Sequence, residues 1–160
     1  MDTQIMNQLV GELSRDTLSE VAPQELPLFR AASQAYFKNP GVLPKTGGDD
    51  MLGFGAGETM SLFAPYVLPA VAEVVKYLAG EIKKAFGEES ASLIGEKVKS
   101  LFKKYRNPDD SKNKVPPLTA EQLAQVQVIA MKEARRLRLS DKNTKLLANA
   151  ITGSLAVGRG

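Results

Sequence analysis

The longest apolar block of the sequence runs from Thr59 to Phe86, and its pattern of hydrophobic and polar positions predicts the centre of the fold. Its first 14 residues carry no charge. From Pro69 onward, apolar residues recur at spacings of three and four, which is typical of an amphipathic helix. Because proline lacks an amide proton and clashes with the preceding turn, we expect a break near Pro65 and a helix that begins at or near Pro69. The pattern thus predicts a central apolar helix over about 69–86.

Shorter amphipathic patterns predict helices on both sides of this block. Apolar residues recur every four positions over residues 3–14, and helical spacing returns over residues 27–38 and 88–106. Gly87 is expected to end the central helix as a C-cap. A capping box at Thr119 and a cap at Ser140 then begin two helices joined by a short turn, which predicts an αα-hairpin.

Together these patterns predict a single all-α domain over residues 1–160. We expect a bundle of five to six helices packed around the central apolar helix, with a long Gly/Pro-rich loop before it. The expected parts are an N-terminal helical arm (1–38), a flexible loop (39–58), the central helices (59–106), a linker (107–118) and a C-terminal helical hairpin (119–156).

The loop over residues 39–58 invites a functional interpretation because loops of this length are uncommon in compact domains. Gly53, Gly55 and Gly57 alternate within it, as in some phosphate-binding loops. No strand precedes them, no Gly-Lys-Ser/Thr follows, and Glu58 would repel a phosphate. We therefore interpret these glycines as a hinge before the apolar block.

Two charges, Glu73 and Lys76, limit what the apolar block can do in a membrane. A spanning helix needs ~20 largely apolar residues, and a window of that length includes both charges. Each charge near a bilayer centre costs ~3 kcal/mol on insertion scales, so constitutive insertion is disfavoured. Glu73 must be exposed, paired with Lys76, or functionally charged at an oligomer axis or pore, and we favour simple exposure.

The composition removes several classes of chemistry. The chain contains neither cysteine nor histidine, which excludes disulfides, thiol chemistry, Cys/His zinc sites and imidazole acid–base catalysis. No catalytic motif is recognisable, and the adjacent acids Asp49 and Asp50 lie in the loop rather than on one rigid face. We predict no enzyme activity, no cofactor and no metal site. The N-terminus lacks a basic secretory signal, so we expect a cytoplasmic location with conditional membrane association.

Charge is distributed unevenly along the chain. Residues 1–75 carry 4 basic and 9 acidic side chains, whereas residues 76–160 carry 17 basic and 9 acidic ones. This asymmetry favours an acidic partner for the second half, although most such runs are solvated helix faces. The predicted basic surface comprises Lys97, Lys103, Lys104, Arg106, Lys132, Arg135 and Arg136.

Three functions remain open. The first hypothesis is a non-enzymatic interaction module that forms a homo-oligomer or docks a protein partner through its apolar central helix and its oppositely charged halves. The alternative is a triggered effector that inserts residues 59–86 into an anionic membrane or forms a pore, and a weaker alternative is nucleic-acid binding through the basic half. No small-molecule substrate is inferred. The predicted interaction or membrane residues are Leu62, Phe63, Tyr66, Val67, Val71, Val74, Leu78, Glu73 and Lys76.

Overall fold

A computed structural model describes residues 3–39, 63–87, 90–102, 105 and 115–155 of the chain. This described part folds into six α-helices and one short 3-10 helix without any strand, which confirms the predicted all-α bundle. The helices are α1 (Thr3–Val21), α2 (Leu26–Lys38), α3 (Ala64–Phe86), α4 (Ala91–Ser100), α5 (Ala120–Arg136) and α6 (Asp141–Leu155), and the 3-10 helix η1 (Pro23–Glu25) joins α1 to α2.

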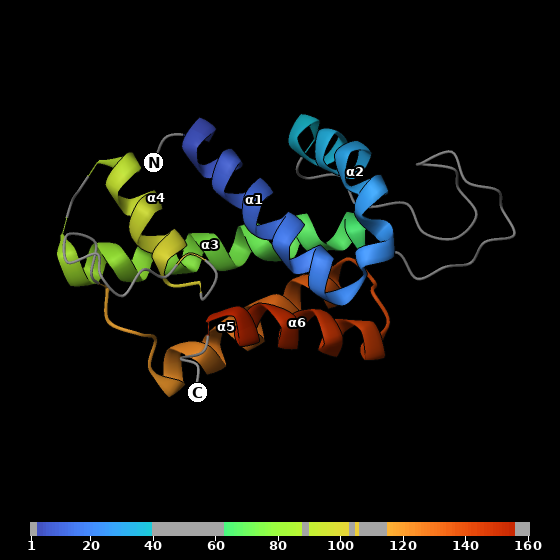
Figure 1. Cartoon of the computed structure of the whole chain (residues 1–160). Helices are drawn as coiled ribbons and strands as arrows, with labels where there is room; N and C mark the ends of the chain where they lie inside the picture. The colour runs from blue at the N-terminus through green and yellow to red at the C-terminus, as the bar shows by residue number, and fades with distance from the viewer. Residues whose placement is uncertain (1–2, 40–62, 88–89, 103–104, 106–114, 156–160) are drawn as a thin grey trace, which may run out of the picture.

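Helix α3 lies at the centre of the bundle (Figure 1). Helices α1 and α2 cross it on one side, and α5 packs on the other. Helix α6 packs against α5 and α1, and α4 lies beside the C-terminal part of α3. The buried side chains of α3 belong to one hydrophobic core with apolar side chains of the other helices. Fully buried examples are Leu13 and Leu18 from α1, Ile94 from α4, Val126 from α5, and Leu147 and Ile151 from α6. Each such side chain contributes ~1.5–3 kcal/mol when it leaves water, so α3 organises the core as its pattern predicted.

The structure corrects the predicted start of the central helix. Helix α3 begins at Ala64 and continues without a break through Pro69, which lies inside the helix. Pro65 fits because it occupies the first turn, where its missing amide proton is not needed. Pro69 forfeits one backbone hydrogen bond, at a cost of ~3 kcal/mol. Every residue from Phe63 to Ala72 is buried, and this packing outweighs the local penalty.

Two flanking helices differ in length from the sequence expectation. Helix α1 continues beyond residue 14 to Val21, because Leu18 extends the buried stripe against the core. Helix α4 ends at Ser100 rather than at residue 106. The amide of Leu101 donates to the carbonyl of Val98, three residues back, which tightens the final turn.

Local end signals account for the remaining boundaries. Gly87 ends α3 with a φ of 81°, a conformation that glycine adopts without strain. Thr119 and Gln122 form the predicted capping box, with distances of 2.9 and 3.1 Å between backbone nitrogen and side-chain oxygen. The Ser140 hydroxyl accepts a hydrogen bond from the amide of Asn143 and caps α6. Helices α5 and α6 thus form the predicted hairpin.

Candidate functional site

The predicted apolar interaction residues lie in the interior of the bundle. Leu62 is outside the described residues, and the other six are between 0 and 7% exposed. These six are Phe63, Tyr66, Val67, Val71, Val74 and Leu78. In this fold they contact the chain's own helices, so a partner could reach them only if the bundle opened. Their role as interaction or membrane residues stays a prediction.

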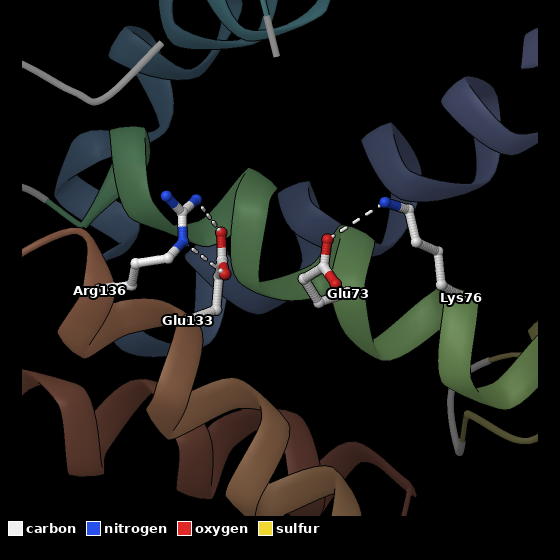
Figure 2. A network of polar contacts seen from close by, with 4 residues as sticks. All are labelled: Glu73, Lys76, Glu133 and Arg136. Carbon is white, nitrogen blue, oxygen red and sulfur yellow. Dashed lines mark hydrogen bonds and ion pairs between the residues drawn. The ribbon is translucent and has the colours of Figure 1, made fainter. Parts of the chain in front are cut away.

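The polar edge of α3 carries an ion pair that faces a second pair on α5 (Figure 2). Lys76 Nζ lies 3.2 Å from Glu73 Oε2, and the Glu73 side chain is 41% exposed. On α5, Arg136 donates to both oxygens of Glu133, at 3.1 Å from Nε and 2.6 Å from Nη2. Both exposure and pairing, the ordinary roles weighed for Glu73, are therefore present.

Electrostatic effects connect these two pairs with each other and with α2. The hydrogen bond and charge of Glu133 raise the pKa of Arg136, and Glu73 adds a smaller effect in the same direction. Burial raises the pKa of Tyr36 on α2, and the charges of Glu73 and Glu133 reinforce that shift. Each carboxylate has a cationic partner, so the four charges of the network sum to zero. This arrangement is typical of a structural contact between helices rather than of a pair of groups for acid–base catalysis.

A buried carboxylate that the sequence analysis missed holds the start of α3. Glu25 is only 3% exposed and belongs to η1, before α2. Its Oε1 accepts hydrogen bonds from the amides of Phe63, at 2.8 Å, and Ala64, at 2.9 Å, and its Oε2 lies 3.0 Å from the Phe63 amide. Since Pro65 has no amide proton and the Tyr66 amide donates to the Phe63 carbonyl, the N-terminus of α3 has all its donors paired.

The protonation of Glu25 is governed mainly by its burial. Burial raises the pKa of its carboxyl, and the amide bonds from Ala64 and Phe63 oppose the shift without reversing it. The positive end of the α3 dipole lies at the same place, which favours a carboxylate there. Nothing in the local pattern identifies Glu25, because its partners lie 38 and 39 residues further along the chain.

The predicted basic surface divides into three groups. Lys103, Lys104 and Arg106 lie outside the described residues. Lys97 is a correction, because it is 7% exposed and its Nζ lies 5.0 Å from the centroid of the Phe86 ring. Lys132, Arg135 and Arg136 are exposed on α5, as predicted.

Further cations join α5 at the turn into α6. We use the name basic corner for five exposed cations: Lys132, Arg135, Arg138, Lys142 and Lys145. The turn is fixed by the buried side chains of Leu137 and Leu139 and by backbone hydrogen bonds from Arg138 to Arg135 and from Leu139 to Ala134. The cations of α5 were predicted from the sequence, whereas the exposed lysines Lys142 and Lys145 at the start of α6 were not included in that surface.

The oppositely charged halves meet within one molecule at α1 and α4. Lys99 Nζ of α4 lies 3.0 Å from Glu12 Oε2 of α1. Nearby, the Tyr105 hydroxyl donates to Asp16, at the wall of a cavity of about 170 Å³ between α1 and α6. Burial, followed by the hydrogen bond and charge of Asp16, raises the pKa of Tyr105 and keeps its hydroxyl protonated as the donor.

Other predicted features receive no test from the geometry. The hinge glycines Gly53, Gly55 and Gly57 lie outside the described residues. Within the described ranges, no group of three or more His, Cys, Asp or Glu side chains could hold a metal ion. No helix in the described ranges is both long enough and apolar enough to cross a bilayer.

Comparisons with protein-family models, curated proteins and solved structures find no match for this chain.

Proposed function

We propose that the chain is a non-enzymatic helical interaction module that docks an anionic partner through the basic corner. The single observation that carries this proposal is a set of exposed cations on the α5–α6 hairpin that have no ion pair within the part of the chain that the structure describes. Among the described residues, Lys132, Arg138, Lys142 and Lys145 have no carboxylate within ion-pair distance. Arg135 lies 3.8 Å from Asp141, a weak contact between exposed groups.

Several cations elsewhere in the molecule differ from this set because they are already paired. Lys76 pairs with Glu73, Lys84 with Glu81 and Lys99 with Glu12, each within 3.2 Å. A paired cation offers little net field to a partner, whereas unpaired neighbours add their fields. Exposed cations without an ion pair among the described residues also occur elsewhere, but they are spread over three helices: Arg15 on α1, Arg30 and Lys38 on α2, and Lys83 on α3. The basic corner has four on one hairpin, which favours it as the docking surface.

The backbone of the corner supports the same proposal. Arg138 has a φ of 72°, a left-handed conformation that costs an L-residue ~1–2 kcal/mol and that glycine adopts freely. Arg138 thus occupies a position where glycine would adopt the backbone conformation without strain, and its side chain is exposed. A strained residue on an otherwise well-packed turn is a common feature of functional surfaces.

The other hypothesised modes of action require a change in the structure or compete with a contact inside it. Docking through the apolar residues of α3, and insertion of residues 59–86 into a membrane, both require the bundle to open first. Head-to-tail association of unlike halves competes with the contact between Glu12 and Lys99 inside one molecule. We therefore place the docking surface on the outside of the hairpin.

Retention on an immobilised sulfated polysaccharide tests whether the basic corner binds anions. A corner variant carries Lys132→Gln, Arg138→Gln, Lys142→Gln and Lys145→Gln. A control variant carries Lys38→Gln, Lys76→Gln, Lys83→Gln and Lys84→Gln, which removes the same charge from exposed positions on α2 and α3. We expect the corner variant to elute at much lower salt than the wild type, and the control variant to elute close to it.

Two outcomes would overturn the proposal. Equal losses of retention in the two variants would show that net charge alone is measured. Weak retention of the wild type at low salt would show that the corner does not dock anions. Light scattering after size exclusion, repeated across salt concentrations, shows whether a second copy is the partner, and a salt-sensitive oligomer lost only in the corner variant would identify it.

A further inference from the structure

An apolar side chain lies among the lysines of the basic corner. Leu146 is 47% exposed on α6, although most large apolar side chains of the bundle are covered. It follows Lys145 directly and lies one helical turn after Lys142, so the three residues share the outer part of α6. This arrangement places one large apolar group inside a field of positive charge.

The combination distinguishes among anionic partners. A nucleic-acid backbone offers phosphates to the lysines but no apolar surface to Leu146. The headgroup region of a bilayer offers both, since apolar side chains enter the acyl boundary while lysines remain with the phosphates. Lysines also reach such a position readily, because their apolar stems extend along the surface while the charge stays in water.

We infer that the anionic partner of the basic corner is a membrane surface rich in acidic lipids. The inference rests on the proposed function and names the partner of that same surface. The corner lies on the bilayer, its cations contact lipid phosphates and carboxylates, and Leu146 enters the interface. Such peripheral contact needs no spanning helix and leaves α3 inside the bundle.

The position of the turn and the charges around it are consistent with contact to an anionic surface. The turn between α5 and α6 lies at the end of the bundle where α3 begins, away from α4 (Figure 1). The acids of this region are Glu133, which pairs with Arg136, and Asp141, which lies near Arg135. Since each Lys or Arg near an anionic surface strengthens binding roughly fivefold, four unpaired cations are enough for salt-sensitive binding.

Sedimentation with vesicles tests this inference on the full chain. Vesicles contain phosphatidylcholine alone or with about a third of phosphatidylglycerol, at low and at moderate salt. We expect binding to the mixed vesicles only, with a loss of about a hundredfold or more in the corner variant and little loss in the control variant. Circular dichroism of each variant confirms that the fold is retained.

Different results would contradict the membrane inference and the proposed anion docking. If the polysaccharide column retains the wild type through its corner but mixed vesicles do not bind it, the membrane inference is wrong and anion docking stands. If duplex DNA binds through the corner and vesicles do not, a nucleic acid is the partner. If neither column nor vesicle binds, both proposals are overturned.

A tryptophan probe tests the orientation directly, because the chain contains no tryptophan. Leu146→Trp places the only indole at the corner, and Leu93→Trp places it at a similarly exposed position on α4, near the other end of the bundle. Mixed vesicles should shift the emission of the first variant to the blue and protect it from acrylamide, and they should leave the second unchanged. Equal shifts, or a shift only at residue 93, would contradict the proposed orientation.

Discussion

Two carboxylates interact with α3, and they lie in opposite environments. Glu73 belongs to α3 and interrupts its apolar sequence, yet its side chain is 41% exposed beside Lys76. Glu25 lies before α2, between Gln24 and Leu26; it is 3% exposed and accepts hydrogen bonds from the first amides of α3. Both acids have mostly apolar neighbours in sequence, so the neighbours alone do not tell which carboxylate is exposed and which is buried.

The difference shows what each group contributes. An exposed ion pair gains little, because water already solvates both charges and salt screens them. A buried carboxylate contributes more when it accepts hydrogen bonds from buried amides. Without it, those amides would have no acceptor, and each would destabilise the fold by its desolvation free energy. We therefore expect the fold to depend strongly on Glu25 and weakly on Glu73.

Substitution of Glu25 by alanine gives the largest expected effect. Glu25→Ala leaves the amides of Phe63 and Ala64 buried without an acceptor and removes the cap of α3. We expect the free energy of unfolding to fall by about 3 kcal/mol at neutral pH. Urea unfolding followed by circular dichroism measures the change.

Glu73→Ala is the matched control, because it removes the same group from a half-exposed position on the helix that Glu25 caps. We expect it to change the free energy of unfolding by less than about 0.5 kcal/mol. Similar losses in the two variants would remove the basis of the comparison.

The part of this fold that follows from local signals could be predicted from the sequence. The spacing of apolar residues located every helix, and Thr119 and Gly87 marked boundaries because a cap depends on residues within one turn. The hairpin of α5 and α6 followed from its short connection. These features need no knowledge of distant contacts.

The remaining features depend on contacts between distant segments. Local rules favoured a helix start at Pro69, but tertiary packing and the cap from Glu25 move the start to Ala64. Lys97 was assigned to the basic surface because its neighbours are basic, whereas burial beside Phe86 depends on how α4 folds back on α3. Glu25 itself could be identified only after its partners were placed 38 residues away.

The pH dependence of stability reports the buried environment of Glu25. The pKa of Glu25 is raised by folding, so the folded state favours the neutral carboxyl. The contribution of this shift to the free energy of unfolding is fully present below the ordinary pKa of 4.5. It is lost as the pH rises through the higher pKa that the carboxyl has in the folded state. Each unit between the two values corresponds to about 1.4 kcal/mol.

Glu25→Gln isolates this contribution, because glutamine does not titrate. We expect the stability of the wild type relative to Glu25→Gln to be highest near pH 4 and to decline as the pH rises. Urea midpoints of both proteins between pH 4 and 8 measure the difference, and effects of all other carboxyls cancel. A relative stability that increases with pH would mean that the amide bonds, not burial, control the group.

A smaller effect is expected for the ion pair on α5. Arg136 makes two hydrogen bonds to Glu133, whose side chain is only 14% exposed. A double-mutant cycle with Glu133→Gln and Arg136→Gln should give a coupling free energy of roughly 0.5–1 kcal/mol. A coupling as large as the loss in Glu25→Ala would show that partial exposure does not weaken the pair.

The smallest effect is expected for Glu73 and Lys76, whose single contact of 3.2 Å joins two side chains that are 41% and 64% exposed. A cycle with Glu73→Gln and Lys76→Gln should give a coupling of about 0.2–0.5 kcal/mol, and 0.5 M salt should abolish most of it because both charges face water. Thermal unfolding of the four proteins at low and high salt measures this coupling. A salt-resistant coupling above about 1 kcal/mol would mean that Glu73 is shielded from water, as Glu25 is. It would then support the hypothesis that Glu73 carries a functional charge.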